Sequence, residues 1–262
     1  YNRTYGFDGR LGIGQNTTVT SFVARTQTPG LSGREHAYSL GFTYNSEEWE
    51  IRNAYTEIGD NFNPEVGFLT RSGFRSVSGR VQRVFRLGPD APFNVLELRP
   101  HVNYDVFWDL EGFQETQFIH IDNHTEFRNG ATVQTGMNLT TEGVTEPFEI
   151  SPGVIVPAGT YDHSEAIIIL FSDQGAPLSA RLTVLAGGFF GGERTSIAPS
   201  VRLRVGEAFN TELSVSHNDV TLPGGSFITD LIISRTSYSF TPRMFVQSLI
   251  QYNDQADLWS AN

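Results

Sequence analysis

The residues best suited to chemistry lie near the middle of the chain. His120, Asp122, His124 and Glu126 occupy every second position. In an extended strand they share one face, so their imidazoles and carboxylates could converge on a divalent cation. Neighbours on one strand are roughly 6.5–7 Å apart, which is wide for one ion unless an adjoining strand adds a ligand. The alternative is a polar wall of solvated charges. We favour the wall, so we predict neither a bound metal nor a cofactor.

A second set of charged residues also alternates with apolar ones. The carboxylates Glu97, Asp105 and Asp109 could serve as an acid–base pair, and the arginines could favour anionic solutes. A ladder of mixed sign inside a water-filled barrel explains both without catalysis. No Gly-x-Ser-x-Gly motif occurs, and we predict no enzyme. The charged residues expected to face a hydrated interior are Glu97, Arg99, His101, Asp105, Asp109, Arg181, Arg202, Arg204 and Arg235.

Composition excludes further classes of protein. All 18 basic residues are arginine, against 29 acids, and the net charge is −11. A nucleic-acid binder needs a concentrated basic surface, which this chain does not supply. Cysteine is absent, so disulfides and thiolate chemistry are ruled out. Abundant Gly and Phe, with only 18% charged residues, favour an all-β protein.

Strands must position these groups. Across residues 95–110 the even positions are apolar and most odd positions are polar or charged, which is the two-residue period of a strand. The pattern recurs at residues 36–44, 131–140, 178–184 and 197–205, giving about 14 segments in all. The apolar run 166–171 breaks the alternation. Short turns at 14–16, 45–48, 129–130, 206–208 and 241–243 alternate with longer connections at 28–35, 58–70, 143–159 and 218–226.

This alternation predicts an up-and-down antiparallel β-barrel with its long loops at one end. A closed meander of about 14 strands has a lumen too wide for side chains to fill, so its interior should be wet and its apolar face should meet lipid. Many segments reach the 9–11 or so residues that span a bilayer. We therefore expect one transmembrane barrel domain over residues 1–262, incomplete at its C-terminus and part of a longer chain.

Three stretches resemble a known family. They are residues 56–68 (TEIGDNFNPEVGF), 218–230 (NDVTLPGGSFITD) and 245–254 (FVQSLIQYND). They look like the C-terminal barrel region of an uncharacterised bacterial family whose members carry an N-terminal domain similar to family-9 carbohydrate-binding modules. The spaced match covers most of the chain, and NFNPEVGF is a fairly specific string. The resemblance implies an outer-membrane barrel fused to a sugar-binding-like domain, without an activity to assign to any residue.

The loops are the remaining candidates for contacts. Their turn-forming residues could fold over the pore or meet other envelope proteins, and residues 143–159 are long enough for a plug or a docking surface. The candidate loop contacts are Asn61, Phe62, Asn63, Pro64, Glu65, Leu222 and Pro223.

We therefore expect a bacterial outer-membrane barrel that contacts lipid and anchors an attached binding domain, with a conduit for small polar solutes as an added role. The alternatives are a substrate-specific porin or transporter, and a soluble β-protein that binds sugar or lipid.

Overall fold

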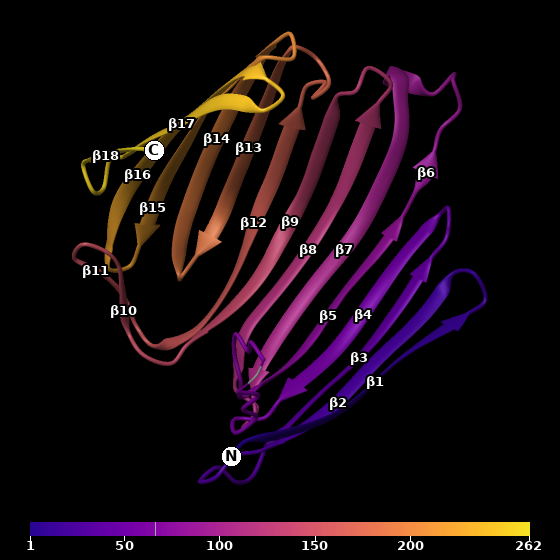
Figure 1. Ribbon diagram of the computed structural model, residues 1–262. Coiled ribbons are helices and arrows are strands. Elements are labelled where there is room, and N and C mark those ends of the chain that lie inside the picture. Colours follow the sequence, from indigo (N-terminus) through magenta and orange to yellow (C-terminus); the bar gives the residue numbers. More distant parts are fainter. Residues whose placement is uncertain (66) are drawn as a thin grey trace.

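The computed structural model describes residues 1–65 and 67–262 and consists almost entirely of strands (Figure 1). Val66, which belongs to the NFNPEVGF string, lies outside the described residues. The first part of the chain forms β1 (Arg3–Ile13), β2 (Thr17–Gln27), β3 (His36–Asn45), β4 (Trp49–Ile58), β5 (Phe74–Arg83), β6 (Phe85–Arg86), the short 3₁₀ turn η1 (Pro92–Asn94), β7 (Val95–Asp109), β8 (Gln114–Phe127) and β9 (Thr132–Val144).

The second part begins with a small hairpin and continues with longer strands. Its elements are β10 (Phe148–Ser151), β11 (Val154–Val156), β12 (Gly159–Phe171), β13 (Leu178–Phe189), β14 (Gly192–Val205), β15 (Phe209–Leu222), β16 (Gly225–Thr241), β17 (Met244–Asn253) and β18 (Leu258–Ala261). The apolar run 166–171 is the end of β12, where its side chains still alternate between two faces.

The strands form one antiparallel sheet in which nearly every strand pairs with the next along the chain. Within the described residues the sheet has 16 strands, β6 pairs only with β7, and β10–β11 form a separate two-stranded sheet. Because that hairpin lies outside the main sheet, β9 pairs directly with β12. The all-β meander predicted from the sequence is confirmed, with more strands than the alternation alone indicates.

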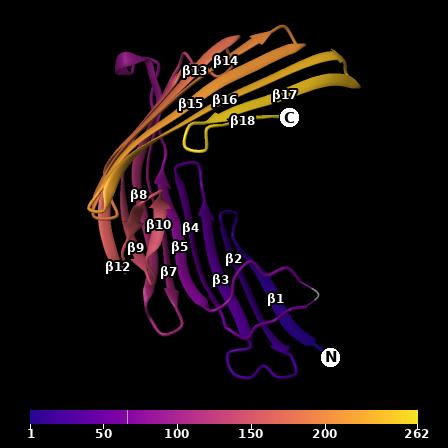
Figure 2. The ribbon, with the colours of Figure 1, turned by 90° about the vertical axis from the view of Figure 1, so that its left-hand side faces the viewer.

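The sheet curves through a wide arc but does not close (Figure 2). Among the described residues β1 and β18 form its two edges and do not pair with each other. The sheet is thus an open curved wall, whereas the sequence predicts a closed barrel. Local alternation specifies strands and faces, but it does not specify which edge meets which.

One predicted loop is wrong. Residues 218–226 read as a long connection because they contain Pro223, Gly224 and Gly225. In the structure β15 extends through Leu222 and β16 starts at Gly225, with Leu222 and Gly225 paired. The glycines and proline therefore build a two-residue hairpin turn, which is the other structure that such residues favour. The connection 143–159, by contrast, is long and contains the β10–β11 hairpin.

The two faces of the wall differ in chemistry. One register row joins Gln82, His101 and Asp122, which are only 5–7% exposed. The adjacent row joins Val81, Val102 and Ile121 on the other face, where Val81 and Ile121 are 37% and 45% exposed. Side chains crowd together on the inside of a curved sheet, so we call the polar, more buried side the concave face and the apolar side the convex face.

A small apolar core lies on the concave face. Val154 and Val156 of the β10–β11 hairpin pack with Val220 and Leu222 of β15, and all four side chains are buried. The side-chain amide of Gln255, in the β17–β18 turn, donates to the Ser151 hydroxyl over 2.9 Å. The hairpin therefore folds inward over β15 instead of extending away from the sheet.

Candidate functional site

Strands β7 and β8 carry the polar residues singled out in the sequence. Their register places His101 opposite Asp122, Arg99 opposite His124, and Asn103 opposite His120. Partners in an antiparallel register point to the same face. The two sequence patterns, one on each strand, therefore form a single polar surface on the concave face.

Three residues converge most closely. Potential ligand atoms of His101, Asp122 and His124 all lie within 4.8 Å of one another. Asp122 Oδ2 is 3.1 Å from His124 Nε2 and 3.4 Å from His120 Nε2. The His101 ring packs edge-on against the His124 ring, with centroids 4.8 Å apart. His101 on β7 thus supplies the additional ligand that β8 alone lacks. We refer to His101, Asp122 and His124 as the histidine–aspartate cluster.

The carboxylate of Asp122 lies at the centre of this cluster. Its side chain is only 2% exposed, and its Oδ1 atom is buried without a hydrogen-bond partner in the described structure. A buried carboxylate oxygen without a donor is costly, since it loses its hydration and gains nothing in return. This orphan oxygen is the chemical feature that most clearly distinguishes the cluster from the rest of the wall.

The surrounding contacts orient two of the imidazoles. His101 Nδ1 lies 3.1 Å from the carbonyl oxygen of Arg99, which can only accept a hydrogen bond. His120 Nδ1 lies 2.7 Å from Asn138 Oδ1, which likewise accepts. In its neutral form the His101 ring therefore carries its proton on Nδ1, and its Nε2 atom keeps a lone pair. This arrangement is typical of histidines that bind a metal through Nε2.

Glu126, the fourth residue of the sequence pattern, does not join the cluster. Its carboxylate pairs with Arg99, which also contacts Glu97 through Nε at 2.9 Å. Two carboxylates therefore neutralise Arg99 at the edge of the cluster, and charges of both signs lie side by side along this part of the wall.

The remaining interior charges have separate environments. Asp109 accepts hydrogen bonds from the backbone of Glu111 and Phe113 and so closes the β7–β8 turn. Asp105 is exposed. Arg202 pairs with Glu212, and the Arg181 guanidinium lies over the Phe171 ring at 5.0 Å.

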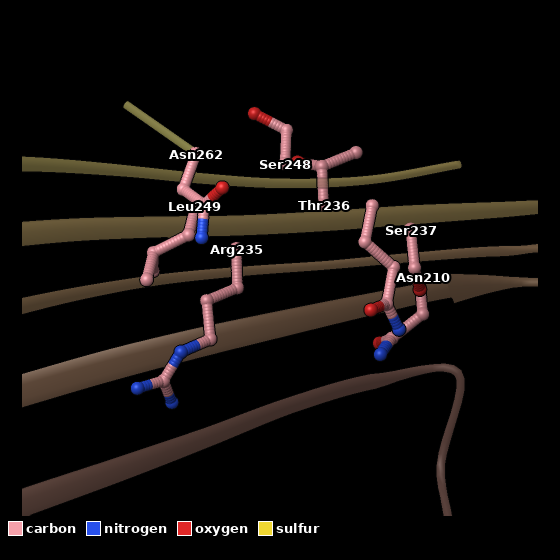
Figure 3. A pocket seen from close by; sticks show the side chains of 8 residues that line it. Asn210, Arg235, Thr236, Ser237, Ser248, Leu249 and Asn262 are labelled. Atoms are coloured by element: carbon pink, nitrogen blue, oxygen red, sulfur yellow. The ribbon is translucent and has the colours of Figure 1, made fainter. Parts of the chain in front are cut away.

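Two further arginines lie near the C-terminal part of the sheet. Arg204 donates to the carbonyl oxygens of Gln174 and Ala176 in the β12–β13 turn. Arg235 lines a hollow of about 550 Å³ beside Leu249 and Asn262, shown in Figure 3. The predicted arginines thus do not converge on one anion site.

The predicted loop contacts mostly hold the loops to one another. The Asn61 side-chain amide donates to the carbonyl oxygens of Ser32 and Gly33, and the Asn63 carbonyl accepts from Asn2. In the same region Arg34 donates to Glu111 and Asp60, and these contacts raise the pKa of Arg34 above its ordinary value.

The other predicted loop residues have different settings. Phe62 and Pro64 are half-buried, and Glu65 is exposed. Leu222 is a core residue, and Pro223 begins the β15–β16 turn.

Sequence reasoning missed a second buried carboxylate. Glu165 on β12 accepts two hydrogen bonds from Arg194 on β14, at 2.6 and 2.9 Å, across Gly187 of β13. The Glu165 side chain is 5% exposed. The sequence does show one signal for this site, an isolated acidic residue just before the apolar run 166–171. Its pairing with Arg194, however, depends on the register of three strands and cannot be read from the sequence.

Comparisons with known proteins add no assignment. No protein-family model matches this sequence, and no curated protein matches it either. Among the described residues no helix is long and apolar enough to cross a membrane.

Proposed function

We propose that this chain forms the wall of a bacterial outer-membrane β-barrel that anchors an attached binding domain. The observation that carries the proposal is the inverted arrangement of the two faces. The concave face holds most of the charged and hydrogen-bonding groups, and the convex face carries most of the large exposed apolar side chains, with the His36–Glu57 and His217–Asp230 pairs among them.

The exposed apolar surface extends along the whole sheet. Its members include large side chains between 36% and 53% exposed, namely Val81, Ile121, Met137, Ile168, Ile197, Leu213, Ile228 and Ile232. Soluble monomers rarely expose contiguous apolar patches beyond a few hundred Å². Lipid contact would remove this surface from water while leaving the charged face hydrated.

Strand length and ring placement support the same proposal. β7, β8 and β16 have 15, 14 and 17 residues, more than the 9–11 or so that cross a bilayer. On the convex face Trp49 lies at one end of the wall, and Trp108 and Trp259 lie at the other. Aromatic residues at both ends match the interfacial positions of membrane barrels.

Two polar groups within the convex face pair with each other. The Tyr104 hydroxyl reaches across Gly79 and donates to Asn53 Oδ1. A Cβ atom on Gly79 would lie 2.6 Å from that same Asn53 atom, so glycine is required for this close approach. Pairing these polar groups suits a surface that meets hydrocarbon, where an unpaired group is costly.

In a membrane the two edge strands would also need partners, because unpaired strand edges are prohibitive in lipid. Closure is thus part of the proposal. The inward-folded β10–β11 hairpin, and the resemblance to barrels that carry a sugar-binding-like domain, favour an anchor over a wide open pore.

Extraction from membranes tests the proposal. We expect the full-length protein to stay in the membrane pellet of producing bacteria after washing with concentrated urea. Release into the supernatant would overturn it and would favour the soluble alternative, in which the apolar face is covered by protein.

Neighbouring substitutions on opposite faces sharpen the test. Ile197 is 41% exposed on the convex face, and Ala198 lines a hollow on the concave face. In lipid, Ile197→Arg should cost about 2–4 kcal/mol and lower the yield of folded protein, while Ala198→Arg should not. Equal yields would contradict a lipid-facing convex surface.

Conductance separates the anchor from the porin alternative. We expect no steady ion-conducting steps when the purified full-length protein is added to a planar bilayer. Regular conductance steps would contradict a role as an anchor alone and would favour a porin or transporter.

A further inference from the structure

We propose that the histidine–aspartate cluster of His101, Asp122 and His124 binds one divalent transition-metal ion of the zinc class. The inference goes beyond the barrel proposal, because it rests on three side chains from two paired strands and not on what surrounds the sheet.

The first argument is the charge balance around Asp122. Its buried carboxylate has an orphan Oδ1 atom and contacts only imidazoles on the Oδ2 side. The nearby guanidinium of Arg99 is already paired with Glu97 and Glu126. A bound cation would supply the missing charge and the missing partner together.

The second argument is that the histidine nitrogens are already placed to bind a metal. In the neutral His101 ring, the bond from Nδ1 to the Arg99 carbonyl leaves the Nε2 lone pair free for a metal. His124 Nε2 already lies 3.1 Å from the Asp122 carboxylate. Ligand atoms around a tetrahedral zinc ion are about 3.3 Å apart, so a spread of at most 4.8 Å requires only small side-chain movements.

The third argument is the close approach of β9 beside the cluster. Gly136 of β9 is the register partner of Asp122. A Cβ atom at this position would lie 2.9 Å from the Asp122 Cβ and would also collide with the Ile121 carbonyl. Glycine therefore lets β8 and β9 approach closely beside Asp122.

The donor set determines the class of ion. Two imidazole nitrogens and one carboxylate oxygen suit Zn²⁺ and its neighbours among the transition metals, whereas Ca²⁺ and Mg²⁺ prefer all-oxygen sites. Three protein ligands leave a fourth position for water or for His120, whose Nε2 lies 3.4 Å from Asp122 Oδ2.

Zinc binding by purified full-length protein tests the inference. After chelator treatment and dialysis, calorimetric titration in detergent should show one saturable Zn²⁺ site per cluster. His101→Gln and Asp122→Asn should each weaken it by about 100-fold or more, since even indirect partners of a metal site contribute 10–100-fold. The control is His217→Gln, which disrupts a histidine–carboxylate contact of 2.7 Å with Asp230 that has no third ligand among the described residues. That variant should bind as the wild type does.

Absence of a saturable site, or equal affinity in all four proteins, would overturn the inference. If Asp122→Asn does not fold, the unmodified protein still provides a test. Zn²⁺ should shield His124, whose side chain is 24% exposed, from diethyl pyrocarbonate but leave His217 reactive, and equal modification of His124 with and without Zn²⁺ would overturn it. Neither result depends on membrane extraction, so the two proposals fail separately.

Discussion

Asp122 and Glu165 are the two buried carboxylates of the concave wall, and they are balanced in different ways. Their side chains are 2% and 5% exposed, and a glycine on an adjacent strand lies opposite each one. Glu165 receives two hydrogen bonds from Arg194. Asp122 faces imidazoles and keeps one oxygen without a partner in the described structure.

The two carboxylates differ in whether the group beside them is always charged. A guanidinium is charged at every accessible pH, so the Glu165–Arg194 pair is complete within the protein. An imidazole carries charge only when protonated, and it otherwise offers a lone pair to a metal. The same wall thus holds a closed ion pair in one region and the proposed cation site in the other.

The largest expected effect comes from breaking the closed pair. Glu165→Leu should lower the free energy of unfolding by about 3–5 kcal/mol, because it leaves the Arg194 guanidinium without its counter-charge. Replacing Arg194 by leucine as well should restore most of the loss. Urea unfolding of the purified protein in detergent measures both.

The matched control is the more exposed Arg202–Glu212 pair, with side chains 43% and 25% exposed. Solvent screens such a pair, so Glu212→Leu should change stability by less than about 1 kcal/mol. A cost for Glu165→Leu no larger than this would remove the distinction between a buried pair and an exposed one.

A third buried carboxylate can be placed where neither kind of partner exists. Val156 is 1% exposed among the apolar residues of the hairpin core. Val156→Asp should cost about 3 kcal/mol and release the β10–β11 hairpin, since swinging outward hydrates the charge. Faster proteolysis within residues 145–158 would report the release.

Ile155 provides the control on the same strand, because it is 55% exposed. Ile155→Asp should leave the cleavage rate unchanged. Equal cleavage of both variants would show that the core does not hold the hairpin in place.

Substitution of Asp122 should change the stability of the protein mainly when zinc is present. With chelator present, Asp122→Asn should unfold within about 1 kcal/mol of the wild type, because no permanent ion pair is lost. Zinc at about 100 times its dissociation constant should stabilise the wild type by about 2.7 kcal/mol and the variant not at all. A large loss in chelator would instead indicate an intrinsic ion pair with the histidines.

The sequence predicts the faces of this wall well because a two-residue period is local. His101 and Asp122 each fall on the predicted polar face of their own strand. Their contact, however, depends on the register between β7 and β8, and an alternating pattern is compatible with any even shift of that register. The pairing of Glu165 with Arg194 spans three strands and is still further from local sequence.

Turn residues explain the other differences between prediction and structure. Pro223 and Gly224 suit a loop and a tight hairpin equally well, so the length of that connection was open. Within residues 143–159 the short strands β10 and β11 become visible only because Val154 and Val156 pack on β15. Edge pairing has no local signature at all, which is why closure could not be predicted reliably.

The smallest effect concerns the glycine beside Asp122. Gly136→Ala would place a Cβ atom 2.9 Å from Asp122 Cβ, so β8 and β9 must shift and carry the carboxylate with them. We expect zinc affinity to fall about tenfold, which is the lower end for indirect changes to a metal site. Gly6→Ala is the control, because its added carbon would meet Ala24 at an ordinary 3.6 Å. If both variants bind zinc as tightly as the wild type, Gly136 does not position Asp122, and the close approach of the strands has only a packing role.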